Sequence, residues 1–300
     1  MTVLRVCGIG VWGTDNHMNT ERYLSYIEEQ GIGKELHYYC SINALEGIIL
    51  KHEIWLRPTS KMNDRLESLF YFNQLYDKLS RITSPIEEHT CEEIFEEIML
   101  KPYMYYPYAM CFSREEYNAA QWERYADDGS GFCVVFDTLK FMELLDNTGV
   151  MLAAVNYGDV NWNNNHLLSM IMEYVRNEAF YSESHMREQL IGQIMVYAST
   201  YKHRSFRTEA ESRIIRFGNQ EEDGILVCNE RIGKTIDSVT KINLANVAEV
   251  WGSSLEGLIK SIVIGPRNDT AVNEAEGYLS KDGDPMGVRG KIKNSECPLR

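Results

Sequence analysis

Residues 132–137, FCVVFD, are almost wholly apolar, and they decide how the fold is interpreted. A short apolar run bounded by turn residues is typical of a strand buried on both faces, in the centre of a sheet. The turn residues are DDGSG at 127–131, and EEYNAAQWERYAD, which runs into them, has the pattern of a helix. We therefore expect a helix, a tight turn and a central strand in succession.

Further strands and helices are predicted on both sides of this segment. The predicted strands are ELHYYCS (35–41), IWLRP (54–58), YPYAMCFS (106–113), MLAAVNYG (151–158) and SIVIGP (261–266). The predicted helices cover residues 20–30, 42–52, 65–82, 86–100, 166–202 and 270–279. This order predicts an α+β fold, with a mixed, largely antiparallel sheet and helical insertions.

The chain has no internal repeat or low-complexity tract, and its glycine- and proline-rich breaks are short. We therefore predict one continuous domain over residues 35–280, with an N-terminal extension of residues 1–34 and a C-terminal tail of residues 281–300.

The composition is that of an ordinary globular chain, with 300 residues, 44% hydrophobic and 25% charged. A formal charge of −14 disfavours sequence-independent binding to phosphate backbones. Seven scattered cysteines form no CxxC pair, which indicates reduced thiols. No apolar stretch approaches the length of a membrane span, so a soluble, cytoplasmic protein is expected.

Glu209, Glu211 and Arg213 alternate along TEAESRII at 208–215. In a strand these three side chains would share one face with Ile215. One interpretation is a solvated face on which Arg213 offsets two acids. The other is that two carboxylates are held side by side for chemistry.

Three common site motifs receive little support. Gly8, Gly10 and Gly13 match GxGxxG, but TDNHMN separates them from the first helix, so a dinucleotide site there is not expected. The histidines lack metal-ligand spacing, so no metal is expected. No GxSxG nucleophile motif is present.

Five ordered stretches resemble a known family. They are HYYCSINALEGIILKHEIWLRPTSKMND, AMCFS, QWERYADDGSGFCVVFD, YKHRSFRTEAESRII and IVIGP, which span about residues 35–266. Together they resemble the bacterial domain-of-unknown-function 2971 family. The layout is also similar, more weakly, to the ADP-ribosyltransferase superfamily, which includes toxins and phage-defence proteins.

The similarity to that superfamily implies NAD as the substrate and a set of site residues. An opening strand there carries a His or Arg, a middle strand an aromatic residue or Ser, and a late strand the catalytic Glu; here these correspond to His37, Ser113 and Glu211. Glu211 would stabilise the ribosyl oxocarbenium, and Glu209 would act as a general base on the acceptor. The residues expected to bind NAD are His37, Tyr38, Ser41, Arg57, Ser113, Trp122 and Arg213.

The expected function is therefore mono-ADP-ribosyl transfer to a macromolecule, protein, RNA or DNA, by a toxin or phage-defence effector that has an antitoxin or defence-system partner. Three alternatives stay open. An NAD glycohydrolase would use water as the acceptor. A non-enzymatic module would bind nucleotide or nucleic acid, and Glu211 and Arg213 would form a structural ion pair. A nuclease would need Asp64, Glu67, Glu209 and Glu211 to gather around a metal.

Overall fold

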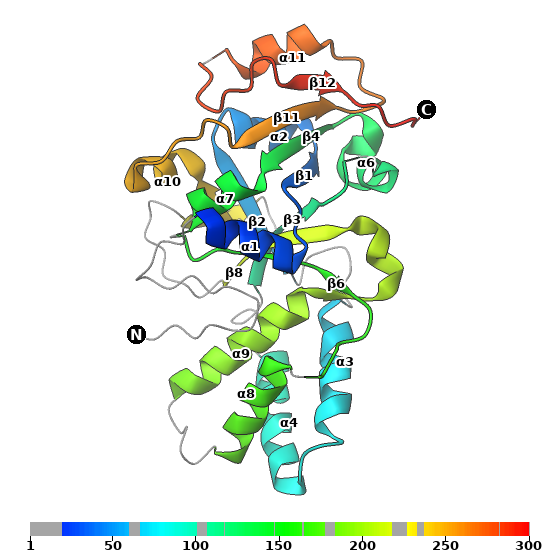
Figure 1. Ribbon diagram of the computed structural model, residues 1–300, viewed down its shortest axis with the longest axis vertical. Coiled ribbons are helices and arrows are strands. Elements are labelled where there is room, and N and C mark those ends of the chain that lie inside the picture. The colour runs from blue at the N-terminus through cyan, green and yellow to red at the C-terminus, as the bar shows by residue number, and fades with distance from the viewer. Residues whose placement is uncertain are drawn as a thin grey trace.

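The computed structural model describes residues 20–59, 67–100, 107–116, 118–146, 148–163, 165–177, 184–217, 227–232, 237–281 and 283–299 (Figure 1). The glycine motif at residues 8–13 lies outside these ranges. Ten strands of the described residues form one sheet, in which the pairings are antiparallel except for that between β11 and β12. The predicted α+β fold with a largely antiparallel sheet is confirmed.

The strands of the sheet have the following bounds: β1 (Glu35–Cys40), β2 (Glu53–Pro58), β3 (Pro107–Ser113), β4 (Phe132–Asp137), β5 (Met151–Ala154), β8 (Glu211–Phe217), β9 (Val227–Ile232), β10 (Asp237–Asn243), β11 (Ile259–Ile264) and β12 (Ile292–Asn294). A separate parallel pair consists of β6 (Asn156–Tyr157) and β7 (Tyr201–Lys202).

Strand β4 is an interior strand, as its apolar sequence predicts. It pairs with β1 on one side and β11 on the other, and Phe132 through Phe136 are all buried. The strand order is β12-β11-β4-β1-β3-β2-β10-β9.

Strand β3 is a branch point of the sheet. It pairs with β8 along its whole length, with β1 at His37–Ser113, and with β2 at Arg57–Ala109. Strand β5 extends the sheet beyond β8. The branch brings the end of β3 and the start of β8 beside the interior of β1, at Ser113, Glu211 and His37.

The helices are α1 (Thr20–Gln30), α2 (Ile42–Ile49), α3 (Glu67–Leu79), α4 (Pro85–Leu100), α6 (Ala119–Tyr125), α7 (Thr138–Leu145), α8 (His166–Arg176), α9 (Ser184–Ser199), α10 (Leu244–Trp251) and α11 (Val272–Leu279), with 3₁₀ turns η2 (Asp127–Gly129) and η3 (Arg204–Glu209). The helix predicted at 166–202 is therefore two helices, α8 and α9. The helix predicted from residue 115 begins only at Ala119, because the Asn118 side chain accepts a hydrogen bond from Gln121 N and caps it.

The two faces of the sheet bury different apolar clusters. Leu36, Phe112, Val134 and Ile214 pack with residues of α1, α7 and α10 on one face. Ala109, Met151 and Ile215 pack on the other face with α3, α4, α8 and α9, which form the lobe at the lower end of Figure 1. The alternation of Ile214 and Ile215 between these clusters fixes which residues of β8 face the lobe.

The first and the last described segments, from Thr20 and from Gly283 onward, pack into the same structure. Tyr23 and Ile27 of α1 and Ile32 after it belong to the main core cluster, and Ile292 of β12 is also buried there. The described parts of the predicted extension and tail are thus built into the fold.

The DDGSG turn is locked to the loop that follows β11. Gly265 N donates to Gly131 O, and Arg267 N donates to Gly129 O, both at 2.9 Å. A Cβ on Gly265 would overlap the carbonyl oxygen of Gly129, so only glycine allows this approach. The lock fixes the position of α6 relative to β4.

Candidate functional site

A turn places Glu209 beside the first residue of β8. Glu209 ends the 3₁₀ turn η3, Ala210 has left-handed backbone angles (φ 45°, ψ 49°), and β8 begins at Glu211. The prediction that Glu209, Glu211 and Arg213 share one strand face is therefore wrong for Glu209. Glu211, Arg213 and Ile215 do share that face.

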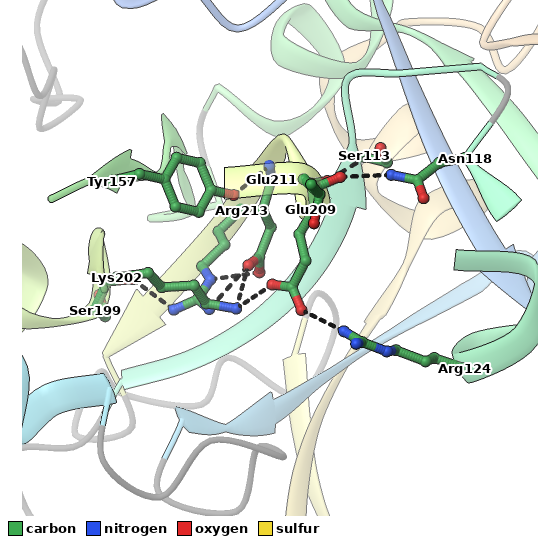
Figure 2. Close-up of polar contacts among 10 residues, drawn as sticks. Ser113, Asn118, Arg124, Tyr157, Ser199, Lys202, Glu209, Glu211 and Arg213 are labelled. Atoms are coloured by element: carbon green, nitrogen blue, oxygen red, sulfur yellow. Dashed lines mark hydrogen bonds and ion pairs between the residues drawn. The ribbon is translucent and has the colours of Figure 1, made fainter. Parts of the chain in front are cut away.

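The last residue of β3 and the loop that follows it hold this turn by hydrogen bonds to the carbonyl groups of the turn (Figure 2). Ser113 Oγ donates to Glu209 O at 3.2 Å, and Asn118 Nδ2 donates to Thr208 O at 2.7 Å. Arg114 N donates to Ala210 O at 2.8 Å. Three successive carbonyl groups are thus fixed, which offsets the cost of a non-glycine residue with positive φ.

Lys202 joins the two carboxylates, as Figure 2 shows. Its Nζ lies 2.8 Å from Glu209 Oε2 and 2.7 Å from Glu211 Oε2. Arg213 meets Glu211 through two contacts, Nε to Oε1 at 2.6 Å and Nη2 to Oε2 at 3.1 Å. Two carboxylates and two cationic side chains therefore form one compact network of ion pairs.

This network is buried. The exposed fractions are 7% for Glu209, 5% for Glu211, 1% for Arg213 and 5% for Lys202. The interpretation of the segment as a solvated strand face is therefore wrong. Buried charges persist only when they are paired, and each of these four has an opposite charge within 3 Å.

The pKa of Glu211 reflects two opposed effects. Burial raises this pKa. The charges of Arg213 and Lys202, together with hydrogen bonds from Arg213 and the Cys111 thiol, lower it by more, and the net pKa is about 2. Glu211 is consequently an ionised carboxylate at neutral pH.

Three further residues complete the site, and sequence patterns did not single them out for it. Arg124 of α6 reaches Glu209 Oε1 at 3.2 Å, with its own side chain 56% exposed. Tyr157 of β6 accepts a hydrogen bond from Glu211 N at 2.7 Å. Arg213 Nη1 donates to Ser199 O at 2.6 Å. The sequence signal for Arg124 was its place in QWERY, within the motif that carries Trp122.

His37, Ser113 and Glu211 form a row across three adjacent strands. His37 stands opposite Ser113 in the β1–β3 pairing, and Ser113 stands opposite Glu211 in the β3–β8 pairing. Directly opposed residues share a face. Burial lowers the pKa of His37, so its ring is neutral at neutral pH. Its Nδ1 lies 3.3 Å from Ser113 O.

Of the other predicted NAD-binding residues, Arg213 contacts Glu211, whereas Tyr38, Ser41 and Trp122 do not join this row. Tyr38 lies on the opposite face of β1, where its ring is 5.8 Å from that of Phe112. Ser41 precedes α2 without a side-chain capping bond. Trp122, predicted as a pocket wall, is 1% exposed and packs edge-on against Tyr39.

Arg57 lies on the same face of the sheet as the row but at a distance from it along the strands. It lies opposite Ala109 of β3 and is exposed.

Among the described residues, no group of three or more His, Cys, Asp or Glu side chains is arranged to hold a metal ion. Of the acids that a nuclease would need, Asp64 and the side chain of Glu67 lie outside the described part of the chain. In the same described ranges, no helix combines the length and apolar character of a membrane span. Cys40, Cys91, Cys111, Cys133 and Cys297 are free thiols.

A family model described as "Protein of unknown function (DUF2971)" matches residues 121–214. The match runs from the start of QWERY to the middle of β8, so it includes Arg124, Lys202, both glutamates and Arg213. The resemblance to that family is confirmed over this stretch. No curated protein and no solved structure matches the chain.

Proposed function

We propose that the protein is an NAD-dependent mono-ADP-ribosyltransferase, with Glu211 as the carboxylate that stabilises the ribosyl cation. The observation that carries the proposal is the row formed by His37, Ser113 and Glu211 on three adjacent strands. These residues are widely separated in the sequence, and each is the type that the similarity to ADP-ribosyltransferases implies for its strand.

The charge of Glu211 suits this role. Cleavage of the bond between ribose and nicotinamide builds positive charge on the sugar, as in glycoside hydrolysis. Arg213 and Lys202 keep the carboxylate ionised. At about 4 Å and an effective dielectric constant near 20, one charge pair is worth about 4 kcal/mol, or roughly a thousandfold in rate.

Glu209 is proposed as the general base that activates the acceptor. It adjoins Glu211 through Lys202, and its other contact is with Arg124, whose side chain is more than half exposed. An acceptor would therefore approach from the Arg124 side. Because the side chain of Glu211 is only 6% exposed, NAD binding would require a local rearrangement that opens a path for the sugar to this carboxylate.

The acceptor under this proposal is a protein, RNA or DNA. The biological setting is that of a cytoplasmic toxin or phage-defence effector with an antitoxin or defence-system partner.

A second candidate is a non-enzymatic nucleotide-binding module, and one observation favours it. The ion pair between Glu211 and Arg213 is buried and has two contacts, as a structural role would require. In that case Glu211→Gln changes stability and no turnover exists to lose.

The deciding experiment uses NAD labelled on its adenylate half, offered to the purified protein with cell protein, RNA and DNA separately. Nicotinamide release with label in one fraction, lost in Glu211→Gln, is the expected result. Release without incorporation would indicate an NAD glycohydrolase. No release under any of these conditions would refute the proposal and favour the binding module.

A further inference from the structure

One ammonium group lies between the two carboxylates of the site. Lys202 Nζ is 2.8 Å from Glu209 and 2.7 Å from Glu211, and its side chain is only 6% exposed. Lys202 comes from β7, whereas the glutamates come from η3 and β8, so the arrangement depends on the folded chain.

The remaining groups around the pair divide unequally between its members. Glu211 also forms an ion pair with Arg213 at 2.6 Å and a hydrogen bond with the Cys111 thiol. Its backbone N–H donates a hydrogen bond to the Tyr157 hydroxyl. Glu209 also forms an ion pair with Arg124 at 3.2 Å. The Arg124 side chain is largely exposed, so water weakens this attraction. Lys202 is therefore the buried cation that both carboxylates share.

We propose that Lys202 is a positioning residue that keeps the Glu209–Glu211 pair doubly ionised and close together. Two neighbouring carboxylates without a shared cation retain a proton between them, because like charges at short range resist double ionisation. A retained proton would prevent a carboxylate from acting as a general base and would weaken the stabilisation of a sugar cation. This catalytic consequence rests on the proposed function, but the charge state of the pair does not.

The charge state can be tested without NAD. Lys202→Met removes the charge and keeps most of the side-chain length, whereas Lys202→Arg keeps the charge. Infrared difference spectra at neutral pH should show a protonated carboxyl in Lys202→Met that is absent from wild type and from Lys202→Arg. Adding Glu209→Gln to Lys202→Met should remove that signal.

A matched control is Lys140→Met, which removes an exposed lysine that lies 3.6 Å from Glu143. It should give no protonated carboxyl. The inference is overturned if Lys202→Met gives none either, or if the signal survives when Glu209 is replaced.

The rate of ADP-ribosyl transfer to the acceptor, the step assigned to Glu209, gives a second readout. In Lys202→Met the acid limb of the pH–rate profile should move up by about 1 to 3 pH units, and Lys202→Arg should restore it. An equal loss of rate at every pH would mark a purely structural role and overturn the inference. If wild type does not cleave NAD at all, the proposed function fails, and the infrared result alone decides this inference.

A double variant that keeps the charges balanced serves as the control for misfolding. If Lys202→Met does not fold, the double variant Lys202→Met with Glu209→Gln should fold, because one cation and one anion are removed together. Failure of both to fold would place the role of Lys202 in packing and overturn the inference.

Discussion

Glu211 and Arg213, two residues apart on β8, form a buried ion pair with contacts at 2.6 and 3.1 Å. The alternation of side chains in a strand puts them on the same face, and the planar guanidinium meets both carboxylate oxygens. The pair therefore has a stability role whether or not Glu211 also acts on a substrate.

The contribution of Glu211 to stability should depend on pH. Its pKa in the folded protein, about 2, lies below the ordinary 4.5, so ionisation favours the folded state. The contribution is complete above pH 4.5 and is lost as the pH falls from there toward 2. Urea unfolding at neutral pH should show Glu211→Gln to be less stable than wild type by on the order of 3 kcal/mol.

As the pH falls from 4.5 toward 2, this difference should shrink, because protonated Glu211 resembles glutamine in charge. A difference that stays constant or widens would contradict the assignment of an ionised, ion-paired Glu211.

The two glutamates should separate by reaction step. Glu211→Gln should lower nicotinamide release about a thousandfold, since it removes the charge that faces the sugar cation. Glu209→Gln should abolish transfer to the acceptor while release continues. Glu143→Gln, on a partly exposed carboxylate of α7, is the control and should leave both steps unchanged. Equal loss of release in the two site variants would refute this division of labour.

Ala210 tests the importance of the turn between the glutamates. Its φ of 45° is tolerated poorly by β-branched residues, so Ala210→Val should destabilise the protein by about 1 to 3 kcal/mol. The same substitution at Ala271, which is exposed with φ −71° and ψ 144°, should have little effect. Thermal and urea unfolding of both variants provide the measurement. Comparable stability of the two would show that the turn is not constrained.

Gly265 and Gly277 should respond oppositely to alanine. At Gly265 a Cβ would overlap the Gly129 carbonyl, so Gly265→Ala should destabilise by about 1 to 3 kcal/mol. At Gly277, inside α11, a Cβ meets nothing within 4 Å, so Gly277→Ala should stabilise by about 0.5 to 1 kcal/mol. Urea unfolding distinguishes the signs. A neutral Gly265→Ala would mean that the DDGSG turn has room to move.

Several features of the fold follow from local sequence. The apolar run of β4 and the periodicity of α1 and α11 gave the correct element types, because burial on both faces or on one helical face leaves a direct pattern. The pattern is less informative where a cap intervenes. Asn118 starts α6 later than its helical sequence suggests, and α8 and α9 are separate helices within one continuous apolar region.

The sequence by itself determined the α+β class, the interior position of β4 and the alternation that joins Glu211 to Arg213. Only the tertiary structure decided that Glu209 leaves the strand, that Lys202 lies between the two acids, and that Arg124, 85 residues away in the chain, reaches Glu209. The physical reason is that sequence patterns record local structure, whereas these contacts join residues of separate elements. Periodicity records which face of an element is buried, whereas a network of buried charges forms only where the packing of separate elements brings opposite charges together and excludes water.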